Sequence, residues 1–261
     1  MNELLIEPIR AFDDNYIWCL RRGNRAAVVD PGDAGPVMRH LESVGAGLVA
    51  VLITHHHGDH VGGLDQLIAR YPAPVHGPAA ERIAGVDRPV RGGDTAVLAE
   101  LGLQFQVLDV PGHTRGHVAY YDPKLPPDGA VFCGDTLFGA GCGRIFEGTP
   151  GQMFDSLSRL AQLPPGTAVY CAHEYTQANL RFALAVEPEN RELLRRAEDV
   201  AAMRAAGKAT VPSLIADELA TNPFLRARAP GVVAAAAARG ADPADAVGVF
   251  AAIREWKNGF R

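Results

Sequence analysis

The chain has 261 residues, of which 48% are hydrophobic and 21% are charged, as in an ordinary globular protein. Its net charge of −5 gives no reason to expect nucleic acid or an anionic membrane as a partner, and no apolar run reaches the roughly 18 residues of a membrane helix. The four cysteines form no Cys-x-x-Cys pair, and residues 1–8 lack the basic stretch of a signal peptide. We therefore expect a cytoplasmic protein with reduced thiols.

The first part of the chain is predicted to form short strands followed by a helix. Apolar residues at 17–20 and 26–30 predict two strands, and the Arg-Arg-Gly-Asn between them is typical of a hairpin turn. Asp30 ends the second strand, where it could serve turn chemistry or support a nearby metal loop; the turn is the favoured interpretation. Residues 34–44 carry apolar side chains at helical spacing and predict a helix.

The most informative stretch is Thr-His-His-His-Gly-Asp-His at residues 54–60. It follows a short apolar run at 48–53 that predicts a buried strand, so the histidines lie on the loop where this strand ends. Several imidazoles and a carboxylate cannot all be buried here without a positive partner, and a divalent metal is the simplest one. A solvated polar loop is the disfavoured alternative, because the stretch lies between two structured patterns.

The next part of the chain repeats this arrangement of a strand followed by histidines. Residues 61–70 predict a helix, and residues 103–110 predict a strand that runs into Pro-Gly-His-Thr-Arg-Gly-His. His113 is a candidate ligand there. His117 could face the same way, although a packed, hydrogen-bonded histidine is the favoured interpretation. Further strands are predicted at 75–77, 96–98 and 118–121.

Two more predicted strands end in candidate ligands. Residues 130–133 run into Gly-Asp-Thr-Leu-Phe, where Asp135 is a candidate ligand and a helix N-cap is the alternative. Residues 168–171 run into Ala-His-Glu-Tyr, which contains His173. Four separate strand ends thus each deliver a candidate ligand, and this repetition is stronger evidence for a metal site than any one motif.

The composition changes after residue 175, where strand signals stop and Ala, Arg, Glu and Leu dominate. We place a boundary there, between a domain at 1–174 and an all-helical domain at 175–261. No long linker separates the two, so the second should pack directly on the first. Helices are predicted at 152–163, 176–187, 189–206, 212–220 and 243–256, with a short surface helix at 234–238.

These motifs resemble those of the metallo-β-lactamase superfamily, and the whole chain resembles its glyoxalase II, or hydroxyacylglutathione hydrolase, branch. The segment Ala-Gly-Cys-Gly-Arg at 140–144 and the helical tail identify the branch. The resemblance implies an α/β fold, namely an αβ/βα four-layer sandwich that binds metal, followed by a smaller helical domain that binds glutathione. Further matching segments are Asp14-Asn15-Tyr16 and residues 146–149, 173–176, 186–190, 210–213, 222–226 and 254–257.

The resemblance implies two divalent metal ions per chain. Zinc is the expected metal, with iron or manganese as alternatives that ligand type does not separate. The two metals would hold a bridging hydroxide and polarise the carbonyl of a thioester, and Asp59 is also a candidate to orient that hydroxide. His56 is expected to point away from the metals. The implied ligands are His55, His57 and His113 for metal 1 and Asp59, His60 and His173 for metal 2, with Asp135 bridging both.

The resemblance also implies the side chains that bind substrate. Arg144 and Tyr175 would contact the glutathione peptide, and Arg254 and Lys257 would bind its glycine carboxylate. The last two are three residues apart and share a helix face, for which a solvated surface is the alternative. The sequence departs from the family pattern at Gly58, which replaces a bulkier residue, at Ala172, which replaces a glycine, and at Phe146, which replaces a tyrosine that can help to bind glutathione.

The implied activity is hydrolysis of S-D-lactoylglutathione and related S-2-hydroxyacylglutathiones to D-lactate and glutathione, the second step of methylglyoxal detoxification, by a monomer. One alternative is a persulfide dioxygenase with one iron, which would not need Asp59 and His60 and would lack the basic helical tail. Another is a silent glutathione-conjugate or metal-binding module, disfavoured because all the implied ligands are present. Lactonase or β-lactamase activity on the same fold is a minor alternative, and the net charge disfavours a nuclease.

Overall fold

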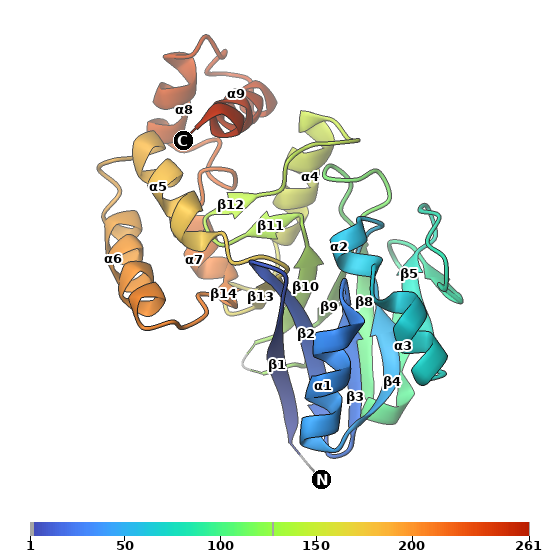
Figure 1. Ribbon diagram of the computed structural model, residues 1–261. Helices are drawn as coiled ribbons and strands as arrows, with labels where there is room; N and C mark the ends of the chain where they lie inside the picture. The colour runs from blue at the N-terminus through green and yellow to red at the C-terminus, as the bar shows by residue number, and fades with distance from the viewer. Residues whose placement is uncertain (1–2, 127, 261) are drawn as a thin grey trace.

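The computed structural model describes residues 3–126 and 128–260 (Figure 1). It contains two six-stranded mixed sheets. None of the helices in these ranges combines the length and the apolar character needed to cross a lipid bilayer. The first sheet, in spatial order, consists of β1 (Leu4–Ala11), β2 (Asn15–Arg22), β3 (Arg25–Val29), β4 (Gly47–Leu52), β5 (Val75–Pro78) and β6 (Arg88–Val90).

The second sheet is built from later strands of the chain, and a small two-stranded ribbon lies beside it. The ribbon pairs β11 (Leu137–Phe138) with β12 (Gly141–Cys142). The second sheet, in spatial order, consists of β14 (Ser213–Leu214), β13 (Ala168–Cys171), β10 (Ala130–Gly134), β9 (Val118–Asp122), β8 (Leu103–Asp109) and β7 (Thr95–Leu98).

The two sheets pack face to face around one apolar core. Side chains such as Trp18 and Leu52 of the first sheet belong to the same buried cluster as Phe105 and Phe132 of the second. Helices α1 (Ala34–Val44) and α3 (Leu64–Arg70) cover the outer face of the first sheet, and α4 (Pro150–Leu160) packs on the second (Figure 1). The layers therefore run helix, sheet, sheet, helix, which confirms the expected four-layer α/β sandwich.

The prediction of one continuous helix at 61–70 is wrong, both in where the helix starts and in its being unbroken. The chain forms a short α2 (Gly58–Val61) and then α3, with a break at two glycines. A Cβ on Gly62 would lie 2.7 Å from the carbonyl oxygen of Gly32, and one on Gly63 would lie 2.4 Å from the nitrogen of Ala34. The backbone thus packs against the loop after β3, and this contact interrupts the helix.

The C-terminal region is mainly helical, but the prediction of an all-helical region needs one correction. Ser213 and Leu214 form β14, which pairs antiparallel with β13, so the helix predicted at 212–220 begins only at Ile215. The short surface helix predicted at 234–238 begins at Pro230 instead; it packs Val232 and Ala236 against the core and exposes its other side. The helices are α5 (Thr176–Val186), α6 (Arg191–Ala205), α7 (Ile215–Thr221), α8 (Pro230–Ala237) and α9 (Ala246–Gly259).

Candidate metal centre

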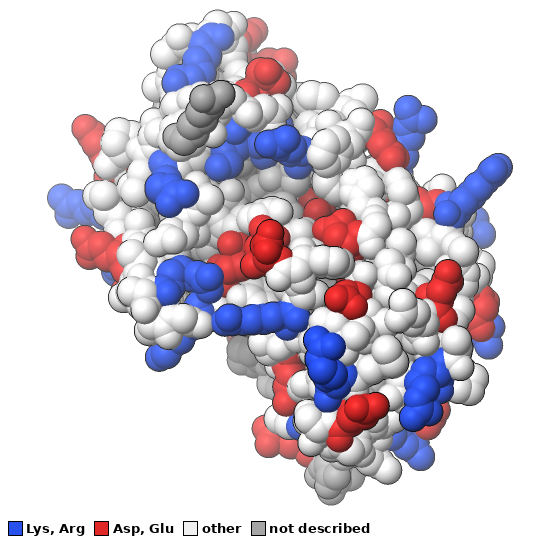
Figure 2. Space-filling view, viewed as in Figure 1, with Lys and Arg blue, Asp and Glu red and all other residues white. Residues whose placement is uncertain are grey.

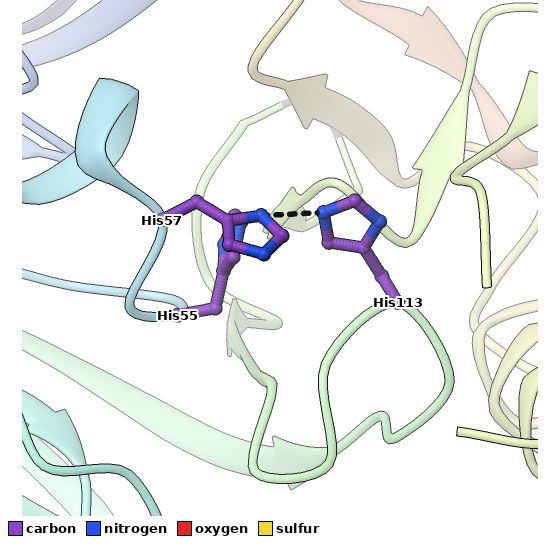
Figure 3. A group of neighbouring side chains, drawn as sticks. All are labelled: His55, His57 and His113. Atoms are coloured by element: carbon purple, nitrogen blue, oxygen red, sulfur yellow. Dashed lines mark hydrogen bonds between the residues drawn. The ribbon is translucent and has the colours of Figure 1, made fainter. Parts of the chain in front are cut away.

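The candidate ligands come from the segments that follow four strands, β4, β8, β10 and β13, and two of them, Asp59 and His60, lie in the short helix α2. In Figure 3, His55 and His57 extend from the loop after β4 and point toward His113 on the opposite loop. His55 is fully buried and His113 is only 4% exposed, so these imidazoles face one another in the interior and not in solvent.

His55, His57 and His113 form one group, which we call the first set. Nδ1 of His57 lies 3.1 Å from Nε2 of His55 and 3.0 Å from Nε2 of His113. Metal–nitrogen bonds of about 2.0–2.1 Å place the ligand atoms of a tetrahedral site roughly 3.3 Å apart. The spacing of the three nitrogens therefore fits one cation.

Asp59, His60 and His173 form a second group, which we call the second set. Oδ2 of Asp59 lies 3.5 Å from Nε2 of His60 and 3.4 Å from Nε2 of His173. His60 is 1% exposed and His173 is 4% exposed. One oxygen and two nitrogens thus converge at a spacing that also fits one cation.

Asp135 lies between the two sets. Its Oδ2 is 3.4 Å from Nε2 of His113, and its Oδ1 is 3.5 Å from Nε2 of His60 and 3.3 Å from Nε2 of His173. The residue before it, Gly134, has φ of 47°, and a Cβ there would lie 2.3 Å from Oγ1 of Thr54. A glycine is therefore required for the turn that places one oxygen of Asp135 toward each set.

The chemistry of these groups fits a pair of divalent cations. Nε2 of His60 and Oδ1 of Asp135 are buried and have no hydrogen-bond partner among the described residues. Buried polar atoms are nearly always satisfied, so two such atoms aimed at one point indicate a missing positive partner. The nitrogen and oxygen donors suit zinc, iron and manganese alike.

The two sets differ in protonation when no metal is bound. Burial lowers the pKa of His55, His57 and His113, so the first set is neutral at pH 7. Burial also acts on His60 and His173, but nearby carboxylates, Asp135 foremost, outweigh it and raise the pKa of His60 well above 6.5 and that of His173 to about 10. Protons therefore occupy the second set until a cation displaces them.

The outer ring nitrogens of two histidines of the first set contact neutral oxygens. Nδ1 of His55 is 3.1 Å from Oγ1 of Thr54, and Nδ1 of His113 is 2.8 Å from the carbonyl oxygen of Arg144. These contacts fix the orientation of each ring. Arg144 thus touches the site through its backbone as well as through the side chain that the sequence pointed to.

The second set is supported by carboxylates. Nδ1 of His60 is 3.1 Å from Oδ2 of Asp30, and Nδ1 of His173 is 2.8 Å from Oδ1 of Asp14. Asn15 donates a hydrogen bond from Nδ2 to Oδ2 of Asp59 at 3.0 Å. Sequence reasoning assigned no role to Asp14 and Asn15, and their position in a matching family segment was the one available signal.

The interpretation of Asp30 as a turn residue alone is wrong. Its φ of 52° and the hydrogen bond from Gly32 N–H to its carbonyl do mark a turn. Its carboxylate, however, accepts hydrogen bonds at 2.7 Å from both the N–H and the hydroxyl of Thr54, and it contacts His60. The turn and the supporting role occur together, because the tight turn aims the carboxylate under the metal loop.

Two histidines near the site are not placed as ligands. His117 stacks on His55 with ring centroids 4.5 Å apart, and its Nε2 accepts a hydrogen bond from the N–H of Asp135. This confirms the packed, hydrogen-bonded interpretation. His56 points away from both sets, as expected, because its ring nitrogens face the carboxylates of Glu81 and Glu147.

A pocket of about 440 Å³ opens beside Asp135 and His113. Arg144, Tyr175, Arg254 and Lys257 all line it, so the four predicted substrate-binding residues lie together. The ring of Tyr175 is stacked on His173 with centroids 4.7 Å apart. In Figure 2, basic side chains gather above a hollow in the middle of this face and acidic side chains lie below it.

Arg254 and Lys257 do not form a solvated helix face. Arg254 is 6% exposed and donates a hydrogen bond from Nη1 to the carbonyl oxygen of Cys142 at 2.9 Å. Burial and the positive charges of Arg254, Arg181 and Arg144 lower the pKa of Lys257 to about 8. A cluster of cations around a pocket, with one of them buried, favours an anionic ligand.

The three departures from the family pattern lie in different surroundings. A Cβ at Gly58 would meet nothing within 4 Å, so no contact requires a glycine there. Ala172 is buried, and its carbonyl accepts a hydrogen bond from Tyr16 N–H at 2.7 Å. Phe146 is 63% exposed at the pocket mouth, with its ring centroid 5.3 Å from that of His113.

Two family models together span almost the whole chain. Residues 11–173 match the metallo-beta-lactamase superfamily, and residues 174–260 match the model described as hydroxyacylglutathione hydrolase C-terminus. A hydroxyacylglutathione hydrolase of Methylobacillus flagellatus is 55% identical over 98% of this chain and 99% of its own length. A hydroxyacylglutathione hydrolase of Cupriavidus metallidurans is 54% identical over 99% of this chain and 100% of its own length. Among solved structures, ETHE1 from Myxococcus xanthus has a TM-score of 0.66 and 26% identity, covering 100% of this chain and 92% of that one.

Proposed function

The chain belongs to the hydroxyacylglutathione hydrolase family of the metallo-β-lactamase superfamily, and on this premise we propose that it hydrolyses S-D-lactoylglutathione. The products are D-lactate and glutathione, and related S-2-hydroxyacylglutathiones are further substrates. This reaction is the second step of methylglyoxal detoxification. The enzyme is a thioester hydrolase.

One observation carries the proposal: a single pocket connects the two ligand sets with a group of cations. Asp135 and His113 line it together with Arg254 and Lys257. A glutathione thioester has a matching division, with a reactive acyl–sulfur bond at one end and carboxylates at the ends of the peptide. The pocket can therefore bind the peptide among the cations while the thioester lies against the ligand sets.

We assign two divalent cations to the site, with zinc as the expected metal. His55, His57 and His113 would hold one cation, Asp59, His60 and His173 would hold the other, and Asp135 would contact both. When bound, such a pair supplies an activated water of lowered pKa and polarises the thioester carbonyl. In the metal-free site, contacts with His173 and His60 hold the pKa of Asp59 far below its usual range, so its carboxylate is ionised and ready for a cation. Asp59 is also our candidate to orient the attacking water.

The basic side chains have separate tasks in this proposal. Lys257 and Arg254 bind the glycine carboxylate, and Arg144 and the hydroxyl of Tyr175 bind the peptide. The burial of Arg254 leaves its guanidinium little freedom, so a substrate carboxylate meets a donor that is already in place. A thiolate is a good leaving group, so departure of glutathione needs little help from an acid.

The alternative of a persulfide dioxygenase with one iron is disfavoured by the same residues. That activity would not need Asp59 and His60, yet both converge with His173 and each has a supporting partner. We propose a monomer as the active form. The four cysteines are free and buried, which supports a reducing compartment such as the cytoplasm.

The test is thiol release from S-D-lactoylglutathione by purified protein whose metal content has been measured. A small panel of other glutathione thioesters, a lactone and a β-lactam defines the specificity. We expect thioester cleavage that is lost on chelation and restored by zinc. Protein with two bound metals per chain and no thiol release would contradict the proposal.

A further inference from the structure

Glu81 lies in the loop between β5 and β6, which supplies none of the candidate ligands. We propose that Glu81 is a positioning residue that holds together the two loops carrying His55, His57 and His113. The proposal rests on the proposed function only in that both need the first set to bind metal. It assigns a role to a part of the chain for which the sequence suggested none.

The carboxylate of Glu81 joins the two ligand loops directly. Its side chain is 5% exposed. Oε2 is 3.0 Å from Nδ1 of His56, while Oε1 accepts hydrogen bonds from the hydroxyl of Thr114 and, at 3.2 Å, from the N–H of Gly116. His56 stands between two residues of the first set, and Thr114 directly follows the third. Each ligand of this set is thus one residue away from a group that Glu81 holds.

The packing around Glu81 shows that the contact is close on all sides. A Cβ on Gly116 would lie 2.5 Å from Cγ of Glu81 and 3.0 Å from Cβ of Ala80. A glycine is therefore required at position 116 for the loop to approach Glu81. The β5–β6 loop and the His113 loop are in van der Waals contact, and the carboxylate is at the centre of that contact.

A second carboxylate completes the arrangement around His56. Oε1 of Glu147 lies 3.1 Å from Nε2 of His56, and Oε2 of Glu147 accepts a hydrogen bond from the N–H of Arg115. The imidazole of His56 is thus held at both nitrogens. Glu147 is 34% exposed, so solvent screens its contact, and Glu81 is the stronger of the two.

The physical reason for the role follows from burial and from the tolerance of a metal site. A buried carboxylate is stable only if donors satisfy it, and removing it leaves its buried donors unpaired. Ligand geometry must be held to within about 0.5 Å, and loss of an outer partner costs roughly 10–100-fold in metal affinity. Among the described residues, no hydrogen bond joins Glu81 to Asp59, His60 or His173, so the loss should be confined to the first set.

The experiment measures the zinc affinity of each set by chelator competition in wild-type protein and in E81A and E81Q. We expect E81A to weaken one of the two binding steps by about 10–100-fold and to leave the other within about twofold. E81Q should fall between, because its amide oxygen can still accept from Thr114 and Gly116. Excess zinc should restore kcat in both variants, with an unchanged KM.

D87A is the matched control, because Asp87 is a carboxylate of the same loop whose bonds go to Val75 and Arg88 and not to a ligand loop. It should leave both zinc affinities unchanged. The proposal is overturned if E81A and E81Q lower only the melting temperature, or if D87A weakens zinc binding equally. Should E81A not fold, E81Q and T114V decide the matter. Affinities are read without substrate, so a wild type that binds two zinc ions and cleaves no thioester would refute the function but not this role.

Discussion

The two ligand sets lie side by side, yet the protein supports them in different ways. His55 and His113 of the first set contact the neutral oxygens of Thr54 and Arg144, and their pKa values are lowered. The histidines of the second set contact the carboxylates of Asp14 and Asp30, and their pKa values are raised. The first set is therefore ready for a metal but depends on loop positioning, whereas the second attracts a cation strongly and must first release protons.

Asp135 is the one candidate ligand that faces both sets, so its loss should affect metal binding at both. We expect D135A to bind at most one metal per chain and to lose at least about 100-fold in activity, because a ligand should matter no less than an outer partner. Metal analysis and thiol release measure this. D155A, which removes an exposed carboxylate from α4, is the control and should behave as wild type. Two retained metals in D135A would show that the carboxylate does not bridge.

Replacing a carboxylate that supports only the second set should lower the metal affinity of that set and leave the affinity of the first set unchanged. We expect D14N to weaken the binding of one metal by roughly 10–100-fold, since Nδ1 of His173 loses its charged partner, and to leave the first set unchanged. Chelator competition measures both steps. D13N changes the exposed neighbouring carboxylate and should have no effect. Equal weakening of both steps in D14N would remove the distinction between the sets.

The pH dependence of metal binding should also differ. Raised pKa values mean that His60 and His173 are protonated at neutral pH without metal, and binding must displace those protons. Affinity of the second set should therefore rise about tenfold per pH unit for each proton released, up to a pH of about 10. The first set, with lowered pKa values, should be nearly independent of pH above about 6.5. Zinc competition between pH 6 and 9 tests this, and identical slopes for the two steps would contradict it.

Substitution of a substrate-binding residue such as Lys257 should leave the metal affinity of both sets unchanged. We expect K257A to raise KM for S-D-lactoylglutathione about tenfold, with metal content and kcat little changed, because a charge-assisted hydrogen bond to substrate is lost. Steady-state kinetics measure the split. K208A removes an exposed lysine and serves as the control. A fall in kcat at constant KM would remove Lys257 from the substrate site.

The parts of the site that the sequence predicted share one property: each is local. The residues of the first and second sets and Asp135 directly follow apolar runs, so the strand ends and the ligands were visible in the same short stretches. The four-layer architecture followed from the resemblance. The structure brings these side chains together in two groups whose ligand atoms lie within 4.8 Å of one another, with Asp135 between them.

The supporting residues could not be predicted because their contacts join distant segments. Asp14 and His173 are 159 positions apart, and Glu81 reaches Thr114 across 33 positions. No periodicity or motif encodes such a contact. The same is true of the break before α3 and of β14, since each is determined by a neighbouring backbone and not by the propensity of its own residues.

The pairing of β14 with β13 means that the C-terminal region cannot be removed without changing the second sheet. Ile215 also donates a hydrogen bond from its N–H to the carbonyl of Thr167. The helical tail therefore covers the edge of the second sheet at β13. Truncation near residue 174 would strip that strand and leave a row of unsatisfied peptide groups, which invites self-association. Removing this tail, or fusing it to a related protein, would therefore change the second sheet itself, because the tail contributes a strand to it.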